Sequence, residues 1–529
     1  MALTTKLYDE LPPDFFIDRD YPGYPLPKGI ISEKDFIVEA RDGCKLACNI
    51  FRPEKPGNFP VILNFTIYGK DIYGMHKGYG VSEVCPFEGP DPGFWVPNDY
   101  VVILFDTRGF GKSHGERRYM YPVDDLYDMI EWAGTQAWSN GNVGMSGVSY
   151  LGAQQYWAAA AQPPHLKAII PWEALIHPKP PYGGMNSFGG IPEAVFMTHV
   201  FKVLPPLSPE LGQTQGPLEV NPVALEKITL PALFCASWCD QCVHTSGTLQ
   251  AYQRISTPPE HKWLYTHGRQ KWEEYYGAES LEIQKKFFDY FLKSIKSVRM
   301  DVSRVRLEVR ETYHKYAVRQ ENEFPLARTE STKLYLDAKT GTLNFDEISR
   351  EGKISYDSID GNTSFDIKFD QDTELTGYMK LKLWVSPEDA DDMDLFVTLW
   401  KLDTKGNRVY FDWCHAWGRF PVALGWLRTS WRELDTEKST PLQPVLKFES
   451  QQKLTPNEIV PCEIEIIASS TLFRKGESLS VVVSGRFGVE TEWFGFSPLV
   501  NKGKHTIYTG GKYDSHLLAP VIAATSGRA

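Results

Sequence analysis

The fold is decided by nine residues, Gly144-Met145-Ser146-Gly147-Val148-Ser149-Tyr150-Leu151-Gly152. Small and apolar residues lead into this stretch, and a helix-like run from Ala153 to Ala161 follows it. The pattern predicts a strand that turns sharply into a helix, with Ser149 at the turn. Gly147 removes a side chain where a strained turn would produce a clash. The free N–H groups at the start of the helix would face negative charge developing beside Ser149.

A strand, a sharp turn carrying a serine and a helix together form the nucleophile elbow of α/β-hydrolases, whose usual signature is G-x-S-x-G. Here Leu151 occupies the position two residues after the serine, and the glycine comes one residue later, at Gly152. Ser146 is a rival nucleophile, but Val148 stands where a small residue is wanted. The alternative interpretation is a Gly/Ser-rich loop with no catalytic role.

Length and charge restrict the class of protein. A chain of 529 residues is too long for one core, so two or three domains are expected. Its net charge of −11 argues against a nucleic-acid partner. No apolar run reaches membrane-spanning length, and Met1 to Pro13 lack the apolar segment of a secretion signal. We therefore expect a cytoplasmic protein without a membrane partner. The oligomeric state stays open, with a homodimer as one option.

Eight cysteines are scattered along the chain, and without a secretion signal we expect reduced thiols. Cys239-Asp240-Gln241-Cys242 is a C-x-x-C motif, which is typical of redox sites or half of a zinc site. A structural zinc site needs a second pair, and only Cys44 and Cys48 are similarly spaced. We therefore expect neither a metal nor another cofactor.

Alternating strand and helix patterns predict a doubly wound α/β sheet in the first 300 residues. Phe59 to Phe65 and Tyr100 to Asp106 are continuous apolar runs, which suit strands buried on both faces. Val123 to Ala137 has helical spacing with acids in its first turn. We assign residues 1–176, including an N-terminal arm, and residues 226–300 to two parts of this α/β domain.

Two further regions complete the expected organisation. Residues 177–225 are rich in Pro and Gly, which predicts a small cap inserted over the carboxyl ends of the strands. In residues 301–529 apolar side chains alternate at period two, which predicts an all-β jelly-roll sandwich. The predicted fold is thus an α/β-hydrolase domain with an inserted cap, followed by a jelly-roll domain.

A nucleophilic serine needs a base, and the base needs an acid to orient it. In α/β-hydrolases the acid and the histidine follow the serine in chain order, on loops after later strands. Asp240 and His267 each follow a short apolar run that is typical of a strand. We therefore predict that Ser149, Asp240 and His267 form a catalytic triad. His244, four residues after Asp240, is the rival base.

An oxyanion hole requires two donors aimed at the tetrahedral oxygen. The N–H of Tyr150, at the start of the helix, is one candidate. The second is expected in the loop Thr66-Ile67-Tyr68-Gly69-Lys70-Asp71, which follows a predicted strand. Either a backbone N–H of this loop or the hydroxyl of Tyr68 would serve.

The elbow Gly147-Val148-Ser149-Tyr150-Leu151-Gly152 resembles that of the cocaine esterase and X-prolyl dipeptidyl peptidase-like (CocE/NonD) family. That elbow has tyrosine after the nucleophile and glycine three residues after it. Tyr68-Gly69-Lys70 resembles the family's Tyr-x-Lys loop, whose tyrosine hydroxyl donates to the oxyanion. Asp106 to Ser113 resembles the family's Arg-Gly-x-Gly-x-Ser segment, and Trp238 to Asp240 resembles its acid loop. Phe287 to Leu292 resembles its closing helix, and Asp389 to Leu399 resembles an early strand of its jelly roll.

The chain also departs from the family pattern. Ile67 stands where the family usually has proline before the tyrosine, and Tyr265-Thr266 precede His267 where tryptophan is frequent. The insertion at 177–225 is shorter than the helical cap typical of the esterases. These differences concern the pocket rather than the triad.

The resemblance implies a serine esterase that acts on a small acyl ester or amide. Ser149 would attack the acyl carbonyl, His267 would act as base and Asp240 would orient it. The Tyr68 hydroxyl and the Tyr150 N–H would hold the oxyanion, and water would release the acid. Three alternatives remain: an acyltransferase that uses the same acyl-enzyme, an X-Pro or aminoacyl peptidase, and a non-catalytic binding protein. An intact triad counts against the last.

The substrate class depends on whether a carboxylate is placed to hold an ammonium group. In the α-amino ester hydrolases of this family, acids lie just beyond the catalytic aspartate, whereas Gln241 to His244 contain none. An unpaired buried ammonium costs several kcal/mol, enough to abolish binding. We therefore expect neutral esters to be preferred, although Glu173, after another predicted strand, offers a carboxylate from elsewhere.

Overall fold

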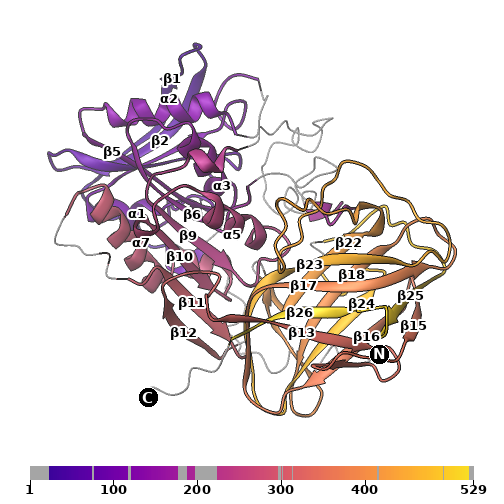
Figure 1. Cartoon of the computed structure of the whole chain (residues 1–529). Coiled ribbons are helices and arrows are strands. Elements are labelled where there is room, and N and C mark those ends of the chain that lie inside the picture. Colours follow the sequence, from indigo (N-terminus) through magenta and orange to yellow (C-terminus); the bar gives the residue numbers. More distant parts are fainter. Residues whose placement is uncertain are drawn as a thin grey trace. The chain divides into compact units, whose positions relative to one another are not determined.

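The computed structural model describes residues 23–73, 77–116, 121–176, 187–196, 223–295, 300, 302–312, 314–413, 416–491 and 494–522. These residues belong to two compact units (Figure 1). Unit 1 comprises Met1–Pro171 and Trp272–Met300, and unit 2 comprises Trp172–Lys271 and Asp301–Ala529. The domain boundaries expected from the sequence stay a prediction.

Unit 1 contains a mixed sheet that begins with the predicted hairpin. β1 (Ile30–Glu39) pairs antiparallel with β2 (Lys45–Pro53), and β2 pairs antiparallel with β4 (Val101–Asp106). β4, β3 (Phe59–Thr66) and β5 (Ser139–Val148) are parallel, in that order. Every residue of β3 and β4 is buried, which explains their continuous apolar runs. The sheet order β1-β2-β4-β3-β5 places the carboxyl end of β5 beside that of β3.

Helices follow the strands of unit 1 as the periodicity predicts. α2 (Val123–Gly134) has Asp124 and Asp125 in its first turn, and α3 (Tyr150–Ala160) directly follows the elbow. α7 ends earlier than the pattern predicts. The spacing predicts a helix from Ala278 to Ile295, whereas α7 runs Ala278–Phe291, because Ser294 takes a left-handed φ of 55°. The remaining short helices of this unit are α1 (Pro92–Trp95), η2 (Lys77–Tyr79) and η3 (Val96–Asn98).

Unit 2 begins with the later strands of the α/β pattern. β9 (Ala232–Ser237), β10 (Lys262–His267) and β11 (Val305–Arg310) are parallel neighbours, and β12 (Tyr316–Glu321) returns antiparallel. β6 (Leu166–Trp172) and α6 (Lys271–Tyr275) lie at the boundaries between the units in sequence. Residues Thr245–Arg254 form α5, and Pro259–His261 form η6. Because β9 and β10 are parallel neighbours, the residues at their carboxyl ends lie at one edge.

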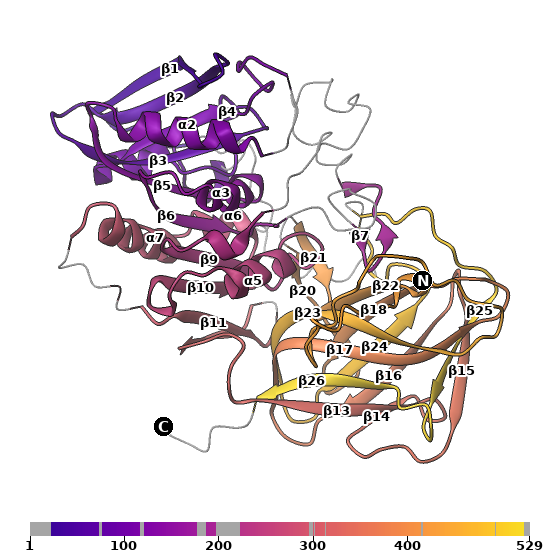
Figure 2. The ribbon, with the colours of Figure 1, turned by 45° about the horizontal axis from the view of Figure 1, so that its top comes forward.

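The rest of unit 2 is built from mostly antiparallel strands around one apolar core, and Figure 2 shows β13, β26 and β17 side by side. On β17, Leu381, Leu383 and Val385 are fully buried, which confirms the expected period-two pattern. The jelly-roll topology stays a prediction. The elements are β13 (Thr329–Asp337), β14 (Thr342–Asn344), β15 (Gly352–Asp357), β16 (Asn362–Lys368), β17 (Thr373–Pro387), β18 (Asp394–Leu402), β19 (Arg408–Val409), β20 (Phe411–Trp413), β21 (Ala416–Phe420), β22 (Ala423–Arg428), η7 (Thr429–Trp431), β23 (Val460–Phe473), β24 (Ser478–Ser484), β25 (Lys504–Thr509) and β26 (His516–Ile522).

The predicted cap falls largely outside the described residues, as does the N-terminal arm up to residue 22. The described parts of 177–225 include a short hairpin of β7 (Ser187–Phe188) and β8 (Ile191–Pro192), and η5 begins at Leu225 and ends at Lys227. Within the described ranges, no helix is long and apolar enough to span a membrane. Seven of the eight cysteines are described, and each is a free thiol.

Candidate active site

Ser149 lies at a strained turn between β5 and α3. Its φ of 56° and ψ of −114° are unusual for a residue other than glycine, and such strain is found at functional sites. The Ser149 side chain does not cap α3 and is partly exposed. The backbone therefore confirms the predicted elbow and presents the hydroxyl outside the helix.

Gly147 is required by close packing behind the elbow. A Cβ at this position would lie 2.6 Å from both Asn64 Nδ2 and Leu151 Cβ. Leu151, which replaces the glycine of the usual signature, is fully buried in the first turn of α3. The altered signature therefore keeps Gly147, the glycine that the close packing behind the elbow requires.

Ser146, the rival nucleophile, is fully buried within β5. Its Oγ lies 3.0 Å from the Tyr275 hydroxyl and donates to Gln284 Oε1 at 3.3 Å. Both partners belong to unit 1: Tyr275 precedes α7, and Gln284 lies within it. These contacts give Ser146 a role in packing β5 against the C-terminal part of unit 1.

Tyr68 follows β3 and reaches the predicted nucleophile, because its hydroxyl hydrogen-bonds to the Ser149 side chain. Burial raises the pKa of Tyr68, and the charge of Glu88 raises it further. The phenol therefore stays protonated and can donate. The Tyr68 ring lies edge-on to Phe87 and Tyr150, with ring centroids 4.9 and 6.2 Å apart. Ser149, Tyr68 and the N–H of Tyr150, the first residue of α3, are called the elbow group below.

Asp240 and His267 occupy the strand ends that the sequence predicts. Asp240 lies three residues after β9, and His267 is the last residue of β10, opposite Ser237 in register. Both side chains are fully buried in unit 2. They share this region with Glu173, His244 and Lys271, and these five residues are called the acid–base cluster.

Within the cluster, Asp240 Oδ2 accepts a hydrogen bond from His244 Nδ1 and lies 3.4 Å from Lys271 Nζ. A carboxylate on Nδ1 is the contact that orients a triad base. However, Lys271 Nζ is also 3.5 Å from His244 Nδ1. Burial lowers the pKa of His244, and Lys271 adds to this lowering although Asp240 opposes it. A base must become an imidazolium during the reaction; at His244 the charge of Asp240 favours that form more than Lys271 disfavours it, and burial is what lowers the pKa.

His267 also faces a buried carboxylate. Its Nε2 lies 3.1 Å from Glu173 Oε1, and its Nδ1 accepts the Arg269 N–H at 3.2 Å. Burial raises the pKa of Glu173, and the adjacent His267 opposes that rise. A neighbouring carboxylate favours the imidazolium that a general base must form, and Glu173 has this effect at His267 as Asp240 has at His244.

The structure brings together some of the predicted residues. Tyr68 contacts Ser149 in unit 1, and Asp240 and His267 both act electrostatically on Glu173 in unit 2. From sequence alone, Glu173 is assigned only as a carboxylate that could hold the ammonium group of a substrate. Its position directly after β6, equivalent to Asp240 after β9, is the signal that could have found it. Lys271 gives no such signal, because buried lysines are rare and nothing in its local sequence marks it.

One group of residues has the composition of a metal site. In the described part of the chain, Glu173, Cys235 and His267 form the only group of three or more His, Cys, Asp or Glu residues whose ligand atoms all lie within 4.8 Å of one another. Oxygen, sulfur and nitrogen donors together suit zinc. The C-x-x-C motif is not part of this group. The expectation that the protein needs no metal stays a prediction.

Residues 42–191 match the model of X-Pro dipeptidyl-peptidase (S15 family), and residues 297–518 match that of the X-Pro dipeptidyl-peptidase C-terminal non-catalytic domain. The solved structure of a CocE/NonD family hydrolase from Staphylococcus aureus is 44% identical, with a TM-score of 0.87. The match covers 93% of this chain and 94% of that one. The chain therefore belongs to the CocE/NonD family of α/β-hydrolases, with a C-terminal non-catalytic domain.

Curated relatives match over shorter stretches. Cocaine esterase of Rhodococcus sp. (strain MB1 Bresler) is 38% identical over 139 residues, which are 26% of this chain and 22% of the esterase. A putative Xaa-Pro dipeptidyl-peptidase of Bacillus anthracis is 30% identical over 185 residues, which are 29% of this chain and 31% of the peptidase. These alignments span less than a third of either relative.

Proposed function

We propose that the protein is a serine esterase that cleaves a small acyl ester through an acyl-enzyme intermediate. Ser149 Oγ attacks the acyl carbonyl while His267 takes its proton and Asp240 orients the base. The Tyr68 hydroxyl and the Tyr150 N–H donate to the oxyanion, and the alcohol leaves with the proton held by His267. Water activated by His267 then releases the acid and restores Ser149.

The observation that carries this proposal is the contact between Tyr68 and Ser149. The Tyr68 phenol shares a hydrogen bond with the hydroxyl of a serine held in a strained turn, and the first N–H of α3 follows directly. Donors fixed beside a nucleophile stabilise the charge that develops in acyl transfer, because they need no reorganisation during the reaction. The choice of His267 over His244 is supported by strand order, since His267 ends β10, the parallel neighbour of β9.

The test has two steps. The purified full chain is treated with a fluorophosphonate, digested and analysed by mass spectrometry, and the label is expected on Ser149. Hydrolysis of a series of nitrophenyl esters of increasing acyl length then measures the pocket. Labelling of another residue, or of none, would refute the assignment of the nucleophile.

An X-Pro peptidase is the second candidate, because the matched family model and the Bacillus relative are both described as X-Pro dipeptidyl-peptidases. Such an enzyme must hold the ammonium of its substrate. Gln241 to His244, just beyond Asp240, contain no acid, and the Oε1 of Glu173, the other carboxylate that the sequence offers, contacts His267. We expect a higher kcat/KM for a nitrophenyl ester than for a matched X-Pro nitroanilide. The reverse order would favour the peptidase.

A further inference from the structure

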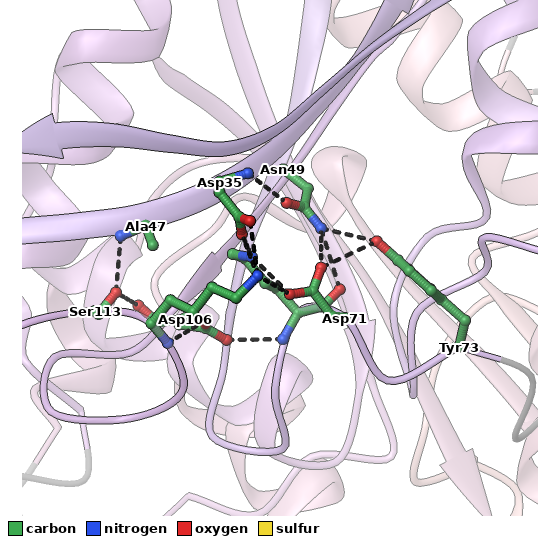
Figure 3. Close-up of polar contacts among 9 residues, drawn as sticks. Asp35, Ala47, Asn49, Asp71, Tyr73, Asp106 and Ser113 are labelled. Carbon is green, nitrogen blue, oxygen red and sulfur yellow. Dashed lines mark hydrogen bonds and ion pairs between the residues drawn. The ribbon is translucent and has the colours of Figure 1, made fainter.

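Five charged side chains form a network within and beside the loop that carries Tyr68, and Figure 3 labels three of them, Asp35, Asp71 and Asp106. The network, called the lysine clamp, consists of Asp35, Lys70, Asp71, Asp106 and Lys112. The Lys70 side chain is fully buried, and its ammonium donates to Asp35 and, at 2.9 Å, to Asp71. Burial of an ammonium requires such partners, since an unpaired charge would be very costly.

The backbone of the Tyr68 loop is held by a second set of contacts. Asp106, the last residue of β4, accepts the Lys70 N–H at 2.7 Å and the Lys112 N–H at 2.8 Å, one on each carboxylate oxygen. A Cβ at Gly111 would lie 2.3 Å from Asp106 Cγ, and Gly111 has a φ of +52°. Ser113 donates to the Asp106 carbonyl at 2.6 Å. The glycine-rich segment after β4 therefore shapes a cradle for one carboxylate that ties two loops together.

Asp35 reaches Lys70 only because β1 is distorted. The register of β1 shifts between Glu33 and Phe36, which marks a bulge, and Asp35 has a φ of 56°. Bulges near active sites re-aim side chains, and backbone strain of this kind persists where the surroundings enforce it. Asn49 accepts the Asp35 N–H at 3.1 Å and donates to Asp71 at 2.8 Å.

Both partners of Lys70 are ionised at neutral pH. Hydrogen bonds from Lys112 and Lys70 lower the pKa of Asp35. Burial alone would raise the pKa of Asp71, but hydrogen bonds from Asn49 and the two lysines outweigh it and bring the pKa to about 2. Asp35 and Asp71, the two carboxylates that hold the Lys70 ammonium, are therefore charged in the range where a hydrolase of this kind works.

We propose that Lys70 is a positioning residue that fixes the Tyr68 hydroxyl at Ser149 for transition-state binding. This inference rests on the proposed function. Lys70 lies two residues after Tyr68. Its ammonium donates to Asp35, outside the loop, and to Asp71, at the end of the loop, and its N–H donates to Asp106. The value of an oxyanion donor depends on its placement before the reaction, and a displacement of about 1 Å can cost ~10²-fold in rate.

The simplest competing explanation is that the clamp only stabilises the fold. A buried ion pair is weak evidence for stability, since its desolvation offsets its attraction. The two roles differ in what they change. A purely structural role lowers the melting temperature and leaves the kcat of the folded protein intact. A positioning role lowers kcat with little change in KM, and it acts through Tyr68.

The test is a double-mutant cycle with Lys70→Met and Tyr68→Phe, measured as kcat and KM for a nitrophenyl ester. We expect Lys70→Met to lower kcat by about 10- to 100-fold with KM within about 2-fold. In the Tyr68→Phe background, Lys70→Met should change kcat by less than about 2-fold, because there is no hydroxyl left to position. If instead the two losses multiply, Lys70 does not act through Tyr68, and the proposal is overturned.

Two further variants keep the test decisive. Lys112→Met is the matched control, because it removes an ammonium from the same carboxylates but from a side chain that is 54% exposed. We expect it to lower kcat less than about 2-fold. Asp35→Asn replaces Lys70→Met if that variant does not fold, since the Asp35 side chain is 46% exposed and asparagine tolerates its φ. A Tyr68→Phe variant with full activity would instead refute the role of Tyr68 in the proposed function.

Discussion

The elbow group of unit 1 and the acid–base cluster of unit 2 differ in how each assigns chemical roles to its side chains. In the elbow group the strained backbone selects Ser149, and the nearby Ser146 is engaged by Tyr275 and Gln284. In the cluster, two carboxylates are paired with two histidines: Asp240 with His244, and Glu173 with His267. Local backbone geometry can therefore identify a nucleophile, whereas the identity of the base depends on the charges that tertiary structure places around each histidine.

The largest effect is expected for Ser149→Ala, which tests whether the strained turn marks the nucleophile. Hydrolysis of nitrophenyl esters should fall by at least ~10⁴-fold, because no acyl-enzyme can form. The fold should persist, since alanine is smaller than serine and fits the same turn. The matched control is Ser146→Ala, which should retain most activity and lower the melting temperature slightly. Strong activity in Ser149→Ala would place the nucleophile elsewhere.

The second prediction addresses the choice between the two histidines. His267→Ala should lower kcat by about 10³-fold or more, because it removes the base. His244→Ala should lower kcat by less than about 10-fold, since the proposed base is His267 and the Nδ1 of His244 is engaged by Asp240. Both variants are compared at equal folded fraction, judged by circular dichroism. If His244→Ala is the more damaging, His244 is the base.

Tyr68→Phe tests the elbow group directly and should have an intermediate effect. Loss of one oxyanion donor is expected to lower kcat by roughly 10²-fold with little change in KM, because the donor acts mainly on the transition state. The ring packs on Phe87 and Tyr150 without its hydroxyl, so the fold should be unchanged. A near-normal kcat would mean that backbone N–H groups alone hold the oxyanion.

Most of the elbow group can be predicted from sequence because each part depends on local chemistry. A glycine behind the turn, a serine at the turn and a helix after it are adjacent in the chain, and the structure has them in that arrangement. Strand ends likewise follow from apolar runs, and β9 and β10 end where the patterns indicate, near Asp240 and at His267. Parallel pairing then brings these ends to one edge.

The cluster could be predicted only in part. The sequence predicts that Asp240 orients His267, but it gives no means of seeing that His244, four residues on at the start of α5, turns back to Asp240. Lys271 is fully buried although lysine is normally exposed, and Glu173 joins the cluster from the distant strand β6. These contacts depend on packing between segments far apart in sequence, which local patterns do not encode.

The smallest effect is expected for Glu173→Gln, which removes the charge next to His267 while keeping the shape of the side chain. We expect kcat to fall by less than about 10-fold. The Glu173 carboxylate, 3.1 Å from the imidazole, favours the protonated ring, which is inactive as a base. Without this charge the ring loses its proton at lower pH, so the acid limb of the kcat/KM profile should shift to lower pH. Profiles of both proteins between about pH 5 and about pH 9 measure the shift.

Thermal stability gives an independent check on the same variant. Burial raises the pKa of Glu173 in the folded state. The stability that it contributes is therefore present below its unfolded pKa of about 4.3 and is lost as pH rises through the raised folded value. The Glu173→Gln variant has no carboxyl group to titrate at this position. Its melting temperature should therefore fall less than that of the parent protein as the pH rises through this range. If the pH–rate and melting profiles of the two proteins coincide, Glu173 is a packing residue and does not tune His267.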